Sequence, residues 1–195
     1  MKRVWICLFL LPLSAEWTFV GTSEWEKIVV DGREVLHLHR AGPVPRDPVR
    51  RPAGIALLPG EPAGAFTLDL MAKSLDFHKK GADICLVFDY RNETDFSYAH
   101  ISNDSNGTVH TVMMRVKGDI RHTVHRERAP PPALRDDWQQ LRLLRKPDGT
   151  VLVFVDDMET PHLTTKLDPD STGRVGVGSF DDRAMFRDIV LNDQP

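Results

Sequence analysis

Two side chains that alternate along one predicted strand carry groups suited to ligand binding. The two-residue period of a β-strand places Tyr98 and His100 on the same face. A flat ring beside a planar polar group could stack on a sugar and exchange hydrogen bonds with its hydroxyl groups. We therefore predict a ligand-binding face here, with Arg115, Arg121 and His125 from the following strands as neighbours. The alternative is that Tyr98 is a ring at the edge of the core and that His100 is hydrogen-bonded within the protein.

Four aspartates form two adjacent pairs at the ends of predicted strands. Asp156 and Asp157 follow a valine-rich segment, and Asp181 and Asp182 follow a glycine-rich one. Calcium takes roughly six to eight oxygen ligands, which clustered loop carboxylates can supply. The sequence therefore suggests a structural calcium ion at these aspartates. The alternative is that they cap turns and keep strand edges soluble.

Charge and composition exclude other kinds of site. The formal net charge of −3 gives no support for a nucleic-acid partner. His122 and His125 fall on opposite faces of a strand and belong to no zinc-binding motif, so we expect no transition metal. Cys85 lies in an apolar strand with no neighbouring base in the sequence, which is typical of a small buried side chain rather than a nucleophile.

The positions of these residues depend on a series of antiparallel strands. Asp148-Gly149 separates two alternating apolar segments, 138–146 and 150–156, and Asp31-Gly32 separates two more. Asp-Gly between such segments is a strong hairpin signal, because both central residues of a type I′ turn need positive φ. About eleven to thirteen short strands, turn signals roughly every eight to twelve residues and no helical period predict an all-β sandwich or barrel.

The N-terminus has the three parts of a secretory signal. A basic start, an apolar run of about ten residues and small residues ending at Ala15 predict a signal peptide over 1–15. The apolar run is too short to cross a bilayer of about 30 Å, so we expect no transmembrane segment after cleavage. The protein is then expected to be secreted or periplasmic, with residues 16–195 forming one domain.

A proline-rich segment interrupts the strand pattern early in the chain. Residues 41–54 contain four prolines and four charged residues without periodicity. Proline fixes φ and lacks a backbone donor, so the segment is predicted to be a surface loop or an extended connector.

Several segments together resemble one superfamily. They are Phe66-Thr67-Leu68-Asp69-Leu70, Cys85-Leu86-Val87-Phe88, Phe96 to Ile101, Asp137-Trp138 with Leu141 to Arg145, Val153 to Asp157, and Gly173 to Phe180. In this order they resemble the concanavalin A-like lectin/glucanase superfamily, especially laminin G-like domains and the bacterial 3-keto-disaccharide hydrolase domain family. The resemblance implies a jelly-roll sandwich of two curved antiparallel sheets, and in some branches a calcium ion at the rim.

The leading functional interpretation is an exported, noncatalytic β-sandwich that binds a saccharide or glycan through the Tyr98 and His100 face. Two alternatives remain open. One is a glycoside hydrolase of the 3-keto-disaccharide hydrolase type, which would use a carboxylate and a histidine as general acid and base. The other is a structural or adhesion module without a small ligand. The sequons at Asn92, Asn103 and Asn106 are glycosylation candidates only in a eukaryotic host.

Overall fold

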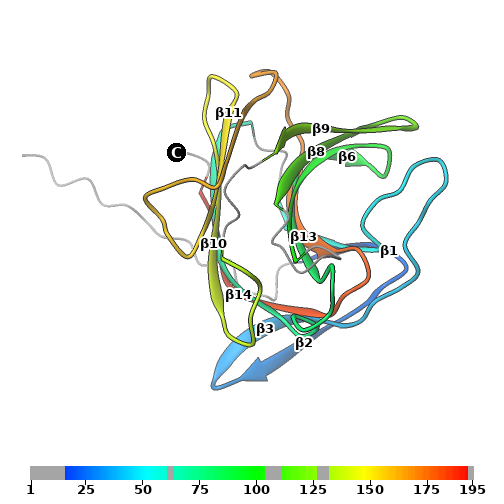
Figure 1. Cartoon of the computed structure of the whole chain (residues 1–195), viewed down its shortest axis with the longest axis vertical. Helices are drawn as coiled ribbons and strands as arrows, with labels where there is room; N and C mark the ends of the chain where they lie inside the picture. The colour runs from blue at the N-terminus through cyan, green and yellow to red at the C-terminus, as the bar shows by residue number, and fades with distance from the viewer. Residues whose placement is uncertain (1–15, 61–63, 104–110, 127–131, 193–195) are drawn as a thin grey trace, which may run out of the picture.

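The computed structural model describes residues 16–60, 64–103, 111–126 and 132–192, and these ranges form two layers of antiparallel β-strands (Figure 1). One layer, called the β6 sheet below, contains seven strands. In spatial order they are β1 (Thr18–Gly21), β4 (Gly54–Leu57), β13 (Arg174–Ser179), β6 (Asp83–Asn92), β7 (Asp95–Ser102), β8 (Val112–Lys117) and β9 (Ile120–Arg126).

The other layer, called the β5 sheet, also contains seven strands. In spatial order they are β12 (Leu163–Lys166), β11 (Thr150–Val155), β10 (Gln139–Arg145), β5 (Phe66–Ser74), β14 (Ala184–Asn192), β3 (Arg33–Arg40) and β2 (Glu24–Val30). The predicted all-β jelly-roll sandwich is confirmed, with more strands than the turn signals indicated. Within the described ranges, no helix has the length and apolar character needed to cross a membrane.

Both predicted hairpins are present, but their turns differ. At the β2–β3 turn Asp31 and Gly32 both have positive φ, of 51° and 74°, as the type I′ expectation requires. At the β10–β11 turn only Gly149 does, with φ of 84°. The backbone N–H of Gly149 donates to the carbonyl of Lys146, so Pro147 occupies the second position of this turn and fixes its φ there. The side chain of Asp148 accepts a hydrogen bond from the backbone N–H of Thr150. The hairpin was therefore predicted correctly from Asp-Gly, but not its turn type.

The main core lies between the two sheets. Alternate residues of β5, from Phe66 to Ala72, are buried there. Val151, Val153 and Val155 of β11 meet them from the same sheet, and alternate residues of β6 meet them from the opposite one. This alternation is the sequence period of two expressed as one buried face per strand.

The β6 sheet is also covered on its outer face, which is turned away from the β5 sheet. A second apolar cluster there includes Cys85, Val87 and Tyr98, and Val49 from the proline-rich segment completes it. Burial raises the pKa of the Cys85 thiol well above its ordinary value, in keeping with a structural side chain.

Residues 41–53 connect β3 of one sheet to β4 of the other and pass over this outer face (Figure 1). Arg51 holds the segment in place by an ion pair with Glu93, with 2.7 Å between Nη2 and Oε2. Ala53 donates a backbone hydrogen bond to the carbonyl of Phe180. The segment is therefore a connector between the layers and a cover for part of the β6 sheet. The predicted signal peptide and the Asn106 sequon lie outside the described residues.

Candidate functional site

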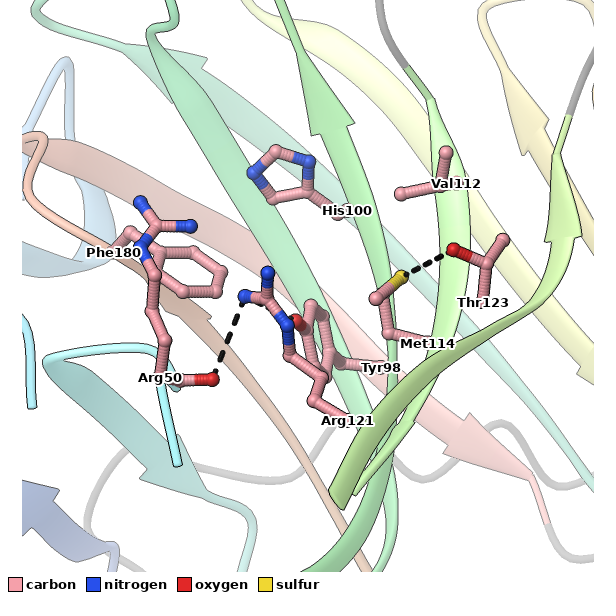
Figure 2. Close-up of a pocket in the computed structure, with 8 residues that line it drawn as sticks. All are labelled: Arg50, Tyr98, His100, Val112, Met114, Arg121, Thr123 and Phe180. Carbon is pink, nitrogen blue, oxygen red and sulfur yellow. Dashed lines mark hydrogen bonds between the residues drawn. The ribbon is translucent and has the colours of Figure 1, made fainter. Parts of the chain in front are cut away.

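A pocket of about 250 Å³ lies on the outer face of the β6 sheet (Figure 2). Eight residues line it: Arg50, Tyr98, His100, Val112, Met114, Arg121, Thr123 and Phe180. Three of the five predicted ligand-binding residues are among them. No aspartate or glutamate is among these eight residues, so the part of the chain that the structure describes lines the pocket with cationic, hydroxyl and apolar groups.

Strand register brings the predicted residues to the pocket. Tyr98 and His100 alternate along β7 with intervening residues that face the core. Met114 of β8 lies opposite Tyr98, and Thr123 of β9 lies opposite Met114. Residues directly opposite each other in an antiparallel pair share a face, so three neighbouring strands contribute to one surface. Arg121 comes from the same face of β9, two residues before Thr123.

Phe180 and Tyr98 form the floor of the pocket. Their ring centroids are 5.8 Å apart, and each residue is only 1% exposed. Burial raises the pKa of the Tyr98 hydroxyl well above its ordinary value. Tyr98 thus lies at the pocket but presents almost no ring surface on which a sugar could stack.

Two guanidinium groups cover this floor. The Cζ of Arg50 lies 4.4 Å from the centroid of the Phe180 ring, and that of Arg121 lies 5.9 Å from it. Arg121 also donates from Nη1 to the carbonyl of Arg50, at 3.4 Å, and to the Tyr98 hydroxyl, at 3.5 Å (Figure 2). A guanidinium over an aromatic face is attracted by the ring quadrupole. Phe180 therefore places both arginine heads at the surface of the pocket.

His100 stands at one wall of the pocket, with its side chain 17% exposed. Its ring meets Phe180 edge-on, with 5.3 Å between centroids and an interplanar angle of 90°. Its Nε2 lies 3.8 Å from Oδ2 of the buried Asp83. Asp83 also accepts a 2.9 Å hydrogen bond from the backbone N–H of Phe180. One carboxylate thus positions two of the residues that line the pocket.

The other two predicted ligand-binding residues are not brought to the pocket by described contacts. Arg115 lies opposite Ser97, on the core-facing side of the β6 sheet, and its Nη2 pairs with Asp95. Arg115 is one position along β8 from Met114, which faces the pocket, and neighbouring strand positions face opposite sides of the sheet. His125 lies in β9 opposite Met113. Its side chain is outside the part of the chain that the structure describes.

The first aspartate pair has structural partners. Asp156 accepts hydrogen bonds from the side chains of Arg135, at 2.8 Å, and Gln139, at 3.0 Å. Asp157 accepts bonds from the backbone N–H groups of Glu159 and Thr160, and these bonds lower the pKa of its carboxyl group. Asp157 therefore caps a turn, as the alternative interpretation stated, whereas Asp156 is bonded to side chains that are distant in sequence.

The second pair belongs to a cluster of carboxylates below the pocket. Ligand oxygens of Asp83, Asp181 and Asp182 lie within 4.8 Å of one another. Asp182 already accepts bonds from the backbone N–H of Asp83, at 3.0 Å, and from Nζ of Lys79, at 3.3 Å. Burial and the nearby Asp83 raise the pKa of Asp182 to about 6. Since Lys79 already places a cation against this cluster, the bonded oxygens fit an internally neutralised network better than an open calcium site.

Sequence reasoning missed Arg50, Phe180 and Asp83. Arg50 lies in a segment without periodicity, so no pattern assigned it to a face. Phe180 was recognised only as the end of a glycine-rich strand. Asp83 carried one usable signal, a charged residue at the start of the apolar strand 83–90.

No protein-family model matches the sequence, and neither does any curated protein.

Solved structures match the fold. A carbohydrate binding module, CBM66 from Bacillus subtilis, has a TM-score of 0.64 and 13% identity, covering 91% of this chain and 96% of that one. The metal-free carbohydrate recognition domain of Emp46p has a TM-score of 0.63 and 14% identity, covering 92% and 88%; a potassium-bound form of the same domain also matches. A putative glycosyl hydrolase from Parabacteroides distasonis has a TM-score of 0.58 and 10% identity, covering 92% and 88%. The chain thus shares the two-sheet β-sandwich fold of these three proteins.

Proposed function

We propose that this protein is an exported, noncatalytic saccharide-binding β-sandwich whose ligand occupies the pocket on the outer face of the β6 sheet. The observation that carries the proposal is the pocket itself, where His100, Arg121 and Thr123 offer polar groups above an apolar floor. A few placed polar groups in an otherwise apolar recess are typical of a small-ligand site. The similar folds of a carbohydrate binding module and a carbohydrate recognition domain support a saccharide as that ligand.

A glycan array probed with the mature chain, residues 16–195, tests this proposal. We expect selective retention of one class of glycan, with loss of binding in Arg121→Ala. The matched control is Lys117→Ala, which removes an exposed cation of neighbouring β8 that does not line the pocket. Retention of no glycan would instead favour the adhesion-module alternative.

A hydrolase of the 3-keto-disaccharide type is the second candidate, favoured by one contact. His100 faces the pocket with Nε2 3.8 Å from Oδ2 of Asp83, an arrangement that could support general acid or base work. Hydrolysis by two carboxyl groups has less support, because the described pocket lining supplies no carboxylate. Turnover of 3-keto-disaccharides that disappears in His100→Ala would replace the noncatalytic proposal with this one.

Of the four aspartates predicted to bind calcium, Asp181 and Asp182 lie in a possible metal-binding cluster, which also contains Asp83. An ion there would have to displace the Lys79 ammonium from Asp182. A melting temperature that rises with added calcium in the wild type, and not in Asp181→Asn, would support such a site. An unchanged melting temperature would assign the cluster to Lys79 alone.

Export is tested by expression of the full-length chain with its native N-terminus. We propose cleavage after Ala15, so the protein recovered outside the cytoplasm should begin at Glu16. Retention of the intact N-terminus in the cytoplasm would contradict this part of the proposal.

A further inference from the structure

The arginines of this protein fall into two groups. In the described part of the chain, ten of them lie within 4.0 Å of an aspartate or glutamate oxygen. They are Arg33, Arg40, Arg51, Arg91, Arg115, Arg135, Arg142, Arg145, Arg183 and Arg187. Pairing with a carboxylate is therefore the usual arrangement for arginine in this fold.

Among the described side chains, four arginines have no such ion pair: exposed Arg46, Arg174, which donates to the Thr18 hydroxyl and the Leu58 carbonyl, and the two arginines of the pocket. Among the described residues, the contacts of Arg50 and Arg121 are with the Phe180 ring, the Arg50 carbonyl and the Tyr98 hydroxyl, and none is with a carboxylate. Both heads lie over the same ring, and no ion pair with a carboxylate in the described part of the chain neutralises either of them. Like charges repel, and the repulsion is relieved when an anion lies between them.

The exposure of the residues that line the pocket favours ligand binding by the guanidinium groups over stacking on the aromatic rings. Tyr98 and Phe180 are almost fully buried, whereas Arg50 is exposed and Arg121 is partly exposed. A ligand entering the pocket therefore meets guanidinium groups before it meets an aromatic face. A guanidinium presents a planar fork of donors whose geometry matches a carboxylate or a sulfate.

We infer that the pocket binds the anionic group of an acidic saccharide, either the carboxylate of a uronic acid or a sulfate ester, between Arg50 and Arg121. This inference rests on the proposed function and names the class of saccharide. The buried rings fix the two guanidiniums, and Thr123 adds a hydroxyl on the same side of the sheet. A neutral sugar would leave both charges unpaired.

Calorimetric titration of the mature chain with matched pairs of glycans tests the inference. One pair is oligogalacturonate and its methyl ester, and the other is a sulfated galactan and its desulfated form. We expect binding of at least one acidic member, with affinity about tenfold or more above its neutral counterpart, and weakening as salt is raised. The pair that shows the difference identifies the anionic group.

Variants locate the binding. Arg50→Ala and Arg121→Ala should each lower the affinity for the acidic glycan about tenfold or more, while Arg46→Ala, an exposed arginine of the same segment that does not line the pocket, should leave it within about twofold. Arg121→Lys retains the charge without the planar fork, so it should bind with intermediate affinity. This variant also keeps the test valid if Arg121→Ala fails to fold.

Each contrary outcome has a distinct meaning. Equal binding of acidic and neutral forms would overturn the acidic class and leave saccharide binding intact. Acidic binding that Arg50→Ala and Arg121→Ala do not weaken would overturn this site. Equal binding of polyglutamate would show a general attraction to polyanions and overturn the inference. Binding of no glycan would overturn the proposed function as well.

Discussion

The carboxylate of Asp182 should make this protein less stable as the pH rises from about 4 to about 7. The group is 4% exposed, and burial together with nearby Asp83 raises its pKa from 3.8 to about 6. Between these values the folded protein holds a proton that the unfolded chain has released. Unfolding then becomes easier as the pH increases, and the effect is complete above the folded pKa.

The size of the effect follows from the shift. One pKa unit corresponds to roughly 1.4 kcal/mol, so a change from 3.8 to about 6 corresponds to about 3 kcal/mol. Asp182→Asn cannot ionise, yet its amide oxygen can still accept the backbone hydrogen bond from Asp83. The free energy of unfolding of the variant, relative to that of the wild type, should therefore increase by about 3 kcal/mol as the pH is raised from 4 to 7.5.

Urea denaturation of both proteins at the two pH values, with a chelator present, measures this difference. The control is Asp170→Asn, an exposed aspartate, for which the difference from wild type should change by less than about 1 kcal/mol. A difference between Asp182→Asn and wild type that is the same at both pH values would refute the reasoning. The reasoning would also be refuted if the wild type became more stable relative to the variant as the pH rises.

Three further outcomes are expected. Burial acts to raise the pKa of Asp76, but hydrogen bonds from Arg183 and Lys79 hold it well below 3.8. The ionised carboxylate therefore stabilises the folded protein above pH 3.8, and this stabilisation is lost as the pH falls further. In the same urea series, Asp76→Asn should lower the free energy of unfolding by about 2 kcal/mol at pH 7 and by less below pH 4. Gly178→Ala would place its Cβ 2.4 Å from the Gly54 carbonyl oxygen and force β13 away from β4, at a cost of about 1–3 kcal/mol or more. Gly64→Ala, whose nearest contact would be an ordinary 3.5 Å, should melt near the wild-type temperature. Phe186→Ala empties a site in the core between the sheets and should lower the free energy of unfolding by about 3–5 kcal/mol, as thermal or urea unfolding would show; a loss below about 1 kcal/mol would contradict the packing described.

The sequence was most informative where the cause of structure is local. Asp31-Gly32 and Asp148-Gly149 both predicted hairpins; positive φ is found at both residues of the first pair and only at Gly149 of the second. The shared face of Tyr98 and His100 followed from strand geometry alone. These predictions needed no knowledge of which strands are neighbours.

The parts that could not be predicted depend on contacts between distant segments. Arg115 was assigned to the ligand face, but its side is decided by its pairing with Ser97, and nothing within β8 specifies that register. Arg50 reaches Phe180 across about 130 residues of sequence, held by a segment with no periodic pattern. Asp83 gains its place under Phe180 and His100 only when β6 and β13 are side by side.

The segment 41–53 gives the pocket a modular construction. It carries Arg50 on backbone that belongs to neither sheet, whereas Arg121 is built into β9. Exchange of this one segment would therefore replace Arg50, one of the two guanidinium groups at the pocket, and leave every strand pairing intact. If the pocket binds the proposed saccharide, substitutions confined to this segment would alter its specificity and leave the sandwich unchanged.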